Sequence, residues 1–152
     1  MIWLMIRISV VLPAPLGVRI EFSPILSAYR ELAAQADIVI VEGVGGFRVP
    51  LNDTQDSADL ALQLGLPVIL VVGMRLGCLN HALLTARAIE DCGLKCAGWV
   101  ASVIDAEMPV LMENIEALQQ RIPVPLLGVM PHQPHPDAHT AARHINIALL
   151  TD

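Results

Sequence analysis

Lysine is nearly absent from this sequence. Its 152 residues contain a single lysine, Lys95, and no stretch fits the pattern GxxxxGK[ST]. In a phosphate-binding loop, that pattern places lysine on the β- and γ-phosphates of a nucleotide and a hydroxyl group on Mg²⁺. The sequence as it stands therefore excludes the usual ATP site.

Paired cysteines and long apolar runs are missing as well. The three cysteines, Cys78, Cys92 and Cys96, form no CxxC pair, and their odd number favours a reducing cytosol over a disulfide scaffold. Apolar runs such as residues 66–74 are far shorter than the roughly 20 residues that span a bilayer. The apolar start of the chain has no basic region before it and no small-residue cleavage site after it. We therefore expect a cytoplasmic protein that is neither exported nor held in a membrane.

The balance of charge excludes another class of function. The net charge is −6, so sequence-independent binding of nucleic acid is not expected. Hydrophobic residues make up 55% of the chain and charged residues 16%, which indicates a large apolar core. A chain of this length suits one domain.

Apolar runs alternate with helical patterns along the chain. We expect strands at 37–43, 67–73, 95–102 and 125–131, and helices at 23–36, 56–65, 80–93, 108–122 and 137–150. Ser23 and Asn80 are the expected caps of the first and third helices, and Gly65 and Gly93 the expected stops of the second and third. This order predicts the α/β class, with a parallel sheet flanked by helices. Residues 1–17 are either a further buried strand or a start that does not belong to the original gene.

Four residues stand where the predicted strands end: Glu42, Gly73, Ser102 and Pro131. In parallel sheets, ligands bind at the carboxyl ends of the strands. The alignment of these strand ends predicts a ligand site at one edge of the sheet.

The stretch "DIVIVEGVGG" places Glu42 at the end of an apolar strand and three glycines after it. A carboxylate in that place is a typical Mg²⁺ ligand of nucleotide-binding α/β domains, and glycines let backbone N–H groups approach an anion. The alternative is an acidic residue at a strand–loop junction whose glycines only turn the chain. Spacing alone gives the two interpretations equal weight.

A second candidate is the loop "GMRLGCLNH", which leads into the helix at 80–93. The free N–H groups and the dipole of a helix start bind carboxylate or phosphate. The alternative is a well-capped core helix behind an unimportant loop. Because Arg75, Gly77 and His81 lie together here, a functional loop is favoured.

Four histidines occur close together in residues 132–144: His132, His135, His139 and His144. Histidines at short spacing can bind zinc or nickel. Prolines interrupt any common helical face here, and no cysteine or carboxylate completes a set of four ligands. A solvated loop is therefore favoured over a metal site.

Taken together, the stretches "ADIVIVEGVGGFRVPL", "LPVILVVGMRLGCLNHALLTARAI", "AGWVAS" and "PLLGVMP" resemble dethiobiotin synthetase, with "INIALL" at the end. They stand in that family's order and spacing, most strongly over residues 28–150, whereas residues 1–22 are atypical. The resemblance implies a three-layer domain like that of P-loop NTPases. It also implies that residues 1–152 form a single incomplete domain without the N-terminal phosphate-binding segment.

The family converts 7,8-diaminopelargonic acid, CO₂ and MgATP into dethiobiotin, ADP and phosphate. By resemblance, Glu42 is a Mg²⁺ ligand, and Val44 and Gly45 approach the reacting carbamate and phosphate. Also by resemblance, Gly77, Cys78 and Asn80 bind the far carboxylate of the substrate, across a homodimer, and Ser102, Pro131 and His132 lie against the adenine.

Two departures from the family pattern lead to further expectations. The GxxxxGK[ST] loop is absent, and Ser102 replaces the asparagine that faces the adenine in the family. We expect the chain alone to show no MgATP-dependent cyclisation, and to expose apolar surface where a strand is missing. The alternative is a non-catalytic remnant that serves as a dimerisation or binding module.

Overall fold

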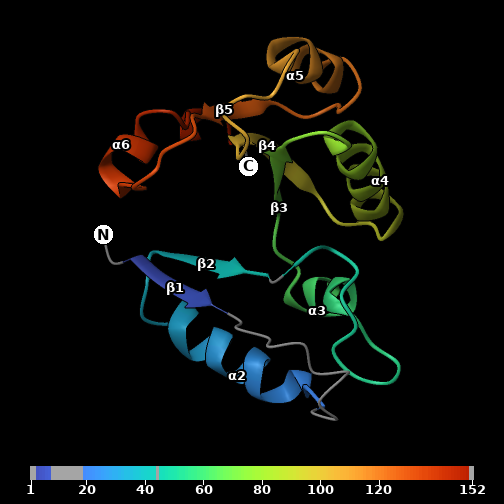
Figure 1. Ribbon diagram of the computed structural model, residues 1–152. Coiled ribbons are helices and arrows are strands. Elements are labelled where there is room, and N and C mark those ends of the chain that lie inside the picture. The colour runs from blue at the N-terminus through green and yellow to red at the C-terminus, as the bar shows by residue number, and fades with distance from the viewer. Residues whose placement is uncertain (1–2, 8–18, 44, 151–152) are drawn as a thin grey trace. The chain divides into compact units, whose positions relative to one another are not determined.

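A computed structural model describes residues 3–7, 19–43 and 45–150, with the backbone alone for residues 3–7 (Figure 1). The chain divides into two compact units, Met1–Leu66 and Pro67–Asp152. Each unit combines parallel strands with helices, which confirms the predicted α/β class with parallel pairing. The assignment of residues 1–152 to one incomplete domain stays a prediction. In the described part of the chain, no helix is both long and apolar enough to cross a membrane.

The first unit is built on a pair of parallel strands. β1 (Trp3–Arg7) pairs with β2 (Ile38–Glu42) in a register that runs from Trp3↔Ile38 to Arg7↔Glu42. Helices α2 (Phe22–Ala33) and α3 (Ser57–Leu64) accompany this pair, and Phe22, Leu51 and Leu60 form a small buried cluster. Trp3–Arg7 form a strand, as one of the two alternatives for residues 1–17 predicts.

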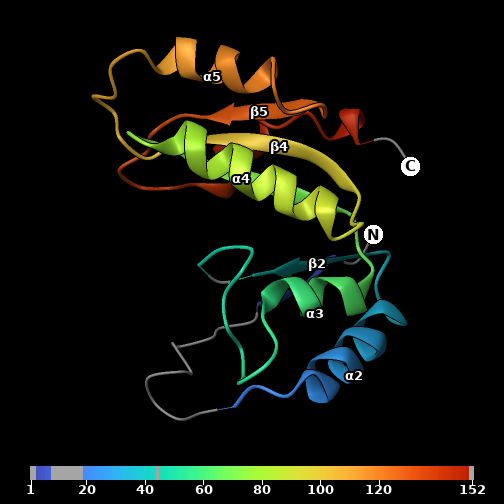
Figure 2. The ribbon, with the colours of Figure 1, turned by 90° about the vertical axis from the view of Figure 1, so that its right-hand side faces the viewer.

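The second unit is a three-stranded parallel sheet in the order β3-β4-β5. Its strands are β3 (Val68–Met74), β4 (Cys96–Val103) and β5 (Leu126–Met130). Helices α4 (Cys78–Asp91) and α5 (Leu111–Gln119) follow β3 and β4 in the chain (Figure 2).

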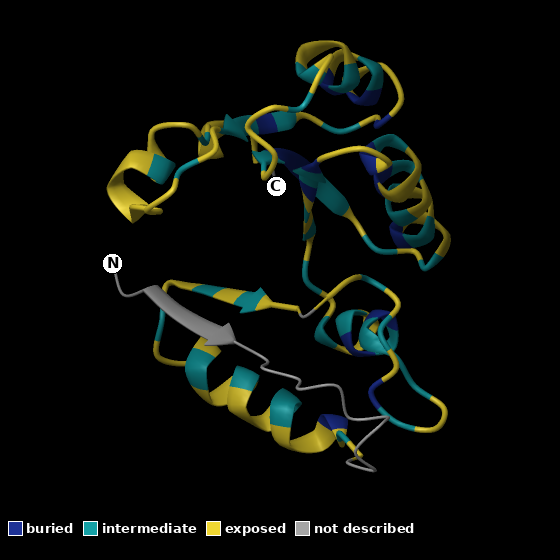
Figure 3. Cartoon of the chain, viewed as in Figure 1, coloured by how far each residue is buried: buried dark blue, intermediate teal, exposed yellow. Residues whose placement is uncertain are grey.

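The core of this second unit lies where α4 and α5 meet the sheet, and Figure 3 shows its buried residues in dark blue. Met74, Trp99 and Leu118 are completely buried, and Ala82 of α4 and Ile115 of α5 pack in the same cluster. Burying one large apolar side chain contributes roughly 1.5–3 kcal/mol. Because β3, β4, α4 and α5 all contribute to one cluster, the strand ends of this unit are held by a common core.

The helix ends confirm two sequence signals and correct two others. Gly65 ends α3 with a φ of 65°, and Gly93, with a φ of 76°, follows the end of α4. The start of α3 carries a capping box at Asp56 that was not predicted. The predicted cap at Ser23 is wrong, because α2 begins one residue earlier at Phe22 behind Glu21. The predicted cap at Asn80 is also wrong: α4 begins at Cys78, and Gly77 is its N-cap residue.

The last predicted helix, at 137–150, is wrong beyond residue 142. α6 (Ala138–Ala142) is followed by a short 3₁₀ turn, Ile147–Leu149. Between them the chain pairs with β5: Ile145 forms an antiparallel bridge with Gly128, and the Asn146 N–H donates to the Leu127 carbonyl at 2.7 Å. Bonds to the sheet replace the helical bonds that these residues would otherwise make.

The described strands form one parallel sheet of two strands in the first unit and one of three strands in the second. Ile40 on β2 and Val71 on β3 are exposed by 50% and 64%, and Ile38 and Ile69 are exposed as well.

Gly128 lies where the returning segment comes closest to the sheet. A Cβ atom at this position would stand 1.8 Å from the backbone oxygen of His144. We therefore expect Gly128→Ala to detach residues 144–146 from β5 and to lower the free energy of unfolding by about 2 kcal/mol. Urea unfolding followed by far-UV circular dichroism measures this change.

Gly43→Ala is the matched control, since no atom of the described residues, apart from the chain neighbours, lies within 4 Å of a Cβ built there. Its effect on the free energy of unfolding should stay within about 0.5 kcal/mol. Equal stabilities of the two variants would contradict the role given to Gly128.

Candidate functional site

Parallel pairing brings three strand ends into one row in the second unit. Gly73 of β3 is in register with Ser102 of β4, and Ser102 with Met130 of β5. Pro131 and His132 follow directly and are exposed. The predicted alignment of strand ends is therefore confirmed for β3, β4 and β5, and it places Ser102 beside the loop that leads from β3 to α4.

The start of α4, at Cys78, lies five residues beyond Gly73 and has free backbone N–H donors. Gly77 has a φ of 89°, a conformation that favours glycine, and no side chain caps the helix. The first helical bond runs from the His81 N–H to the Gly77 carbonyl at 3.3 Å, and the Cys78 N–H donates to the Arg75 carbonyl at 3.0 Å. Helix geometry leaves the N–H groups of Leu79 and Asn80 without acceptors inside the helix. These two donors, with the positive end of the helix dipole, can bind an anion.

The predicted substrate residues at this helix start have different surroundings. The side chain of Cys78 is buried in the core of the second unit, with 3% of its surface exposed. Gly77 and Asn80 are exposed. An approaching carboxylate can therefore reach the backbone of this turn and the amide of Asn80, whereas the Cys78 thiol serves packing.

In the first unit, Glu42 is the last residue of β2 and is exposed. Gly45 follows with a φ of 78°, while Val44 lies outside the described residues. Mg²⁺ is commonly held by one or two carboxylates, with water and substrate phosphates completing its shell. A single exposed carboxylate before a glycine turn fits that mode of binding.

The chain after the glycines is fastened to the start of α3. The Ser57 hydroxyl lies 2.7 Å from the carbonyl oxygen of Phe47 and accepts a hydrogen bond from the Val49 N–H at 2.9 Å. Arg48 forms an ion pair with the N-cap residue Asp56 at 2.7 Å. The sequence analysis missed this anchor, although the D-x-x-D spacing of Asp56 and Asp59 signals the helix start on which it is built.

The candidate residues are thus distributed over the two units. Glu42 and Gly45 belong to the first unit, and the second unit carries the other described candidates, namely Gly77, Cys78, Asn80, Ser102, Pro131 and His132. The binding roles given to all of these residues stay predictions.

The histidine-rich segment has an acidic residue at its centre. Its four histidines are exposed, and no group of three or more histidine, cysteine or acidic side chains in the described ranges could hold a metal ion. Asp137 caps α6 by accepting a hydrogen bond from the Thr140 N–H at 2.8 Å. Hydrogen bonds from the side chain and backbone of Thr140 hold the pKa of Asp137 below its usual value. The structural role that the described contacts give to Asp137 is therefore that of the N-cap of α6.

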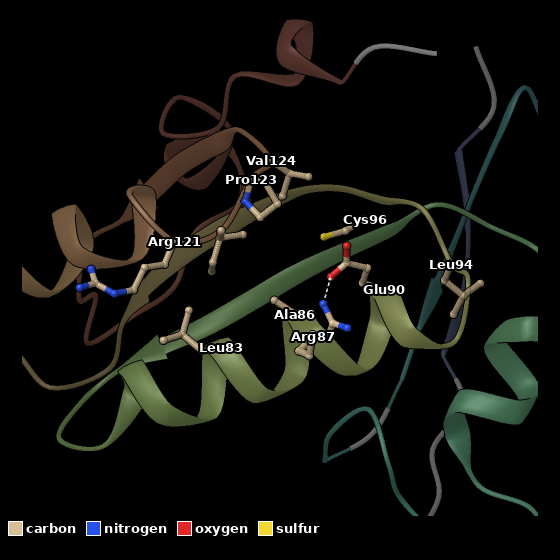
Figure 4. Close-up of a pocket in the computed structure, with 10 residues that line it drawn as sticks. Leu83, Ala86, Arg87, Glu90, Leu94, Cys96, Arg121, Pro123 and Val124 are labelled. Atoms are coloured by element: carbon tan, nitrogen blue, oxygen red, sulfur yellow. Dashed lines mark hydrogen bonds and ion pairs between the residues drawn. The ribbon is translucent and has the colours of Figure 1, made fainter.

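A pocket of about 390 Å³ lies at the opposite end of the second unit, where β4 begins and α4 ends (Figure 4). Arg87 at its rim forms ion pairs with Glu90 at 3.0 Å and Asp91 at 2.9 Å. Burial raises the pKa of the Cys96 thiol in its wall above the ordinary value. The pocket is lined by Leu83, Ala86, Arg87, Glu90, Leu94, Cys96, Arg121, Ile122, Pro123 and Val124. None of these was predicted as a site residue.

Comparison with known proteins supports the resemblance. Residues 10–140 match the family described as an AAA domain. The chain is 57% identical to the ATP-dependent dethiobiotin synthetase BioD of Ralstonia nicotianae over 134 residues, which are 88% of this chain and 58% of that protein. It is 64% identical to the protein of that name from Aromatoleum aromaticum over 116 residues, 76% of this chain and 52% of the relative. It is 54% identical to the protein of that name from Nitrosospira multiformis over 132 residues, which are 87% of this chain and 58% of the relative. The chain thus spans between 52% and 58% of the length of these relatives.

The raised pKa of Cys96 leads to a measurable outcome. At pH 8 a half-buried thiol with a raised pKa has little thiolate, so iodoacetamide should modify Cys96 about tenfold more slowly than it modifies glutathione. Peptide mass spectrometry over time gives the rate at this residue. Unfolding in urea should remove the difference, and a folded-state rate equal to that of glutathione would contradict the effect of burial.

Proposed function

We propose, from the premise that the chain belongs to the AAA-domain family, that it provides the metal-binding and substrate-binding part of an ATP-dependent dethiobiotin synthetase. The observation that carries the proposal is the high identity, 54–64%, over matches that cover most of this chain. Because the chain spans little more than half of these relatives, the activity of the whole enzyme is itself part of the proposal.

The proposed reaction closes a cyclic urea in three steps. One amine of 7,8-diaminopelargonic acid adds to CO₂ and loses a proton, giving a carbamate. A carbamate oxygen takes the γ-phosphoryl group of ATP and releases ADP. The second amine then attacks the carbonyl carbon, loses its proton and expels phosphate, which leaves dethiobiotin.

Glu42 is the proposed Mg²⁺ ligand, and Mg²⁺ would neutralise charge on the phosphate oxygens during transfer. The fit rests on an exposed carboxylate at the end of β2, directly before a glycine turn. Val44 and Gly45 are proposed to bring backbone N–H groups near the carbamate and phosphate. No lysine of this sequence stands in a GxxxxGK[ST] loop, so these residues alone do not make a triphosphate site.

The far carboxylate of the substrate is proposed to bind at the start of α4, through Gly77, Cys78 and Asn80. Support comes from the uncapped helix start and from the two first-turn N–H groups that lack an acceptor inside the helix. Cys78 would take part through its backbone, since its thiol is buried. A carboxylate bound there would interact favourably with the helix dipole.

Ser102, Pro131 and His132 are the proposed contacts of the adenine. Support comes from the row of strand ends, in which Ser102 is in register with Met130. Pro131 and His132 directly follow Met130 in the chain. A serine hydroxyl is shorter than an asparagine amide and has one donor hydrogen instead of two. The base would therefore be held here by fewer direct bonds than an asparagine would provide.

We further propose that the protein is a cytoplasmic homodimer and that this chain alone does not complete the cyclisation. A second candidate function is a non-catalytic module for binding or dimerisation. It is favoured by the exposed apolar side chains of Ile69 and Val71 on β3, which are 45% and 64% exposed. Such a module requires no site for the diamine substrate, so a binding experiment separates the two functions.

Titration of the ¹⁵N-labelled chain with 7,8-diaminopelargonic acid tests the substrate site. We expect the amide resonances of Gly77, Leu79 and Asn80 to shift, because their N–H groups line the helix start. The matched control ligand is 2,3-diaminononane, which has a methyl group in place of the carboxylate and should leave these resonances in place. Absence of any shift at residues 77–80 with the amino acid would overturn the proposed substrate site and favour the binding module.

A further inference from the structure

We propose that Ser57 is a positioning residue that holds the glycine turn after Glu42 in the conformation that binds phosphate. The inference rests on the proposed function of Glu42 and Gly45, and it adds a residue for which the resemblance gives no role. Ser57 is the first residue of α3 and lies ten residues beyond Phe47 in the sequence.

The Ser57 side chain contacts backbone groups of residues 46–49, the segment that follows the turn. Its Oγ lies 2.7 Å from the Phe47 carbonyl oxygen and 3.2 Å from the Gly46 carbonyl oxygen. The Val49 N–H donates to the same Oγ at 2.9 Å. The backbone N–H of Ser57 also donates to the Val49 carbonyl at 2.9 Å.

A hydroxyl group is suited to these contacts because it donates one hydrogen and accepts up to two. Its single hydrogen goes best to the nearer Phe47 carbonyl, while its lone pair receives the Val49 N–H. An alanine at this position would leave both partners without the hydroxyl, although it is fully compatible with a helix. Loss of the hydroxyl therefore changes the turn without removing α3.

The helix that carries Ser57 is a firm anchor. Asp56 accepts hydrogen bonds from the N–H groups of Ala58 at 2.8 Å and Asp59 at 3.2 Å. The Asp59 carboxylate in turn accepts from the Asp56 N–H at 2.8 Å. This reciprocal cap fixes the first turn of α3, so the Ser57 Oγ has a defined position.

Arg48 provides a second link between the same two segments, but a weaker one. Its ion pair with Asp56 measures 2.7 Å, and the Arg48 side chain is 64% exposed. Solvent screens the pair from its Arg48 side, although the Asp56 side chain is only 17% exposed. The partly buried bonds of Ser57 are thus the better candidates for holding residues 46–49 in place.

Phosphate binding by a glycine turn depends on the direction of successive backbone N–H groups. Gly45 and Gly46 lack side chains that would restrict them, and both have positive φ values, 78° and 157°. The N–H groups of such a flexible turn keep one direction only if the residues on either side of the turn are held in place. Ser57 fixes the segment that begins at Gly46, on the side of the turn away from Glu42.

The test compares Ser57→Ala with Ser57→Thr in the full chain, and with Ser27→Ala as the control. Ser27 is an exposed serine of α2 in the same unit. Amide hydrogen exchange of Val49 reports the hydrogen bond to Ser57 and requires no ligand. Shifts of the Gly45 and Gly46 amides during titration with inorganic phosphate and Mg²⁺ report binding at the turn.

We expect Ser57→Ala to accelerate exchange at Val49 at least tenfold and to weaken phosphate binding at least threefold. Ser57→Thr keeps the hydroxyl and should restore both values, and Ser27→Ala should change neither. Faster exchange with unchanged phosphate affinity would overturn the positioning role, as would unchanged exchange. If the unmodified chain shows no shift at Gly45 or Gly46, the phosphate site itself is overturned, whatever the exchange at Val49.

Discussion

The parallel pairing of β3, β4 and β5 over one apolar core is the constraint on which the second unit depends. Trp99 and Met74 are fully buried between these strands and the helices, so the register of the strands cannot shift without disturbing the core. That register aligns Gly73, Ser102 and Met130 at one edge. It also fixes where α4 begins, because only three residues separate Met74 from Cys78.

Backbone groups carry much of the candidate chemistry of this chain. The start of α4 offers N–H groups, and the glycine turn after Glu42 offers more, while the Cys78 thiol is occupied in packing. Binding by backbone groups requires that the backbone be held still. The apolar core does this for α4, and the bonds of Ser57 and Asp56 do it for the segment after the glycine turn.

Much of this arrangement could be predicted from the sequence, because it follows from local patterns. The apolar runs predicted the positions of β2 to β5, and Gly65 and Gly93 predicted where α3 and α4 end. The Asn80 cap was mispredicted because Gly77 adopts a left-handed conformation that starts the helix earlier. The end of the last helix was missed because Ile145 and Asn146 bond to β5, a partner far away in the sequence. Ser57 was missed for the same reason, since its bonds depend on a fold that returns residues 46–49 to α3.

The measurement that tests the central claim most directly is dethiobiotin formation by the purified 152-residue chain. The chain would be incubated with 7,8-diaminopelargonic acid, bicarbonate, Mg²⁺ and ATP, and the product detected by mass spectrometry, with the Ralstonia nicotianae relative as the positive control. With the proposed substrate and metal groups but no GxxxxGK[ST] loop, this chain should give no dethiobiotin, whereas the relative should. ATP-dependent formation of dethiobiotin by this chain alone would contradict the account.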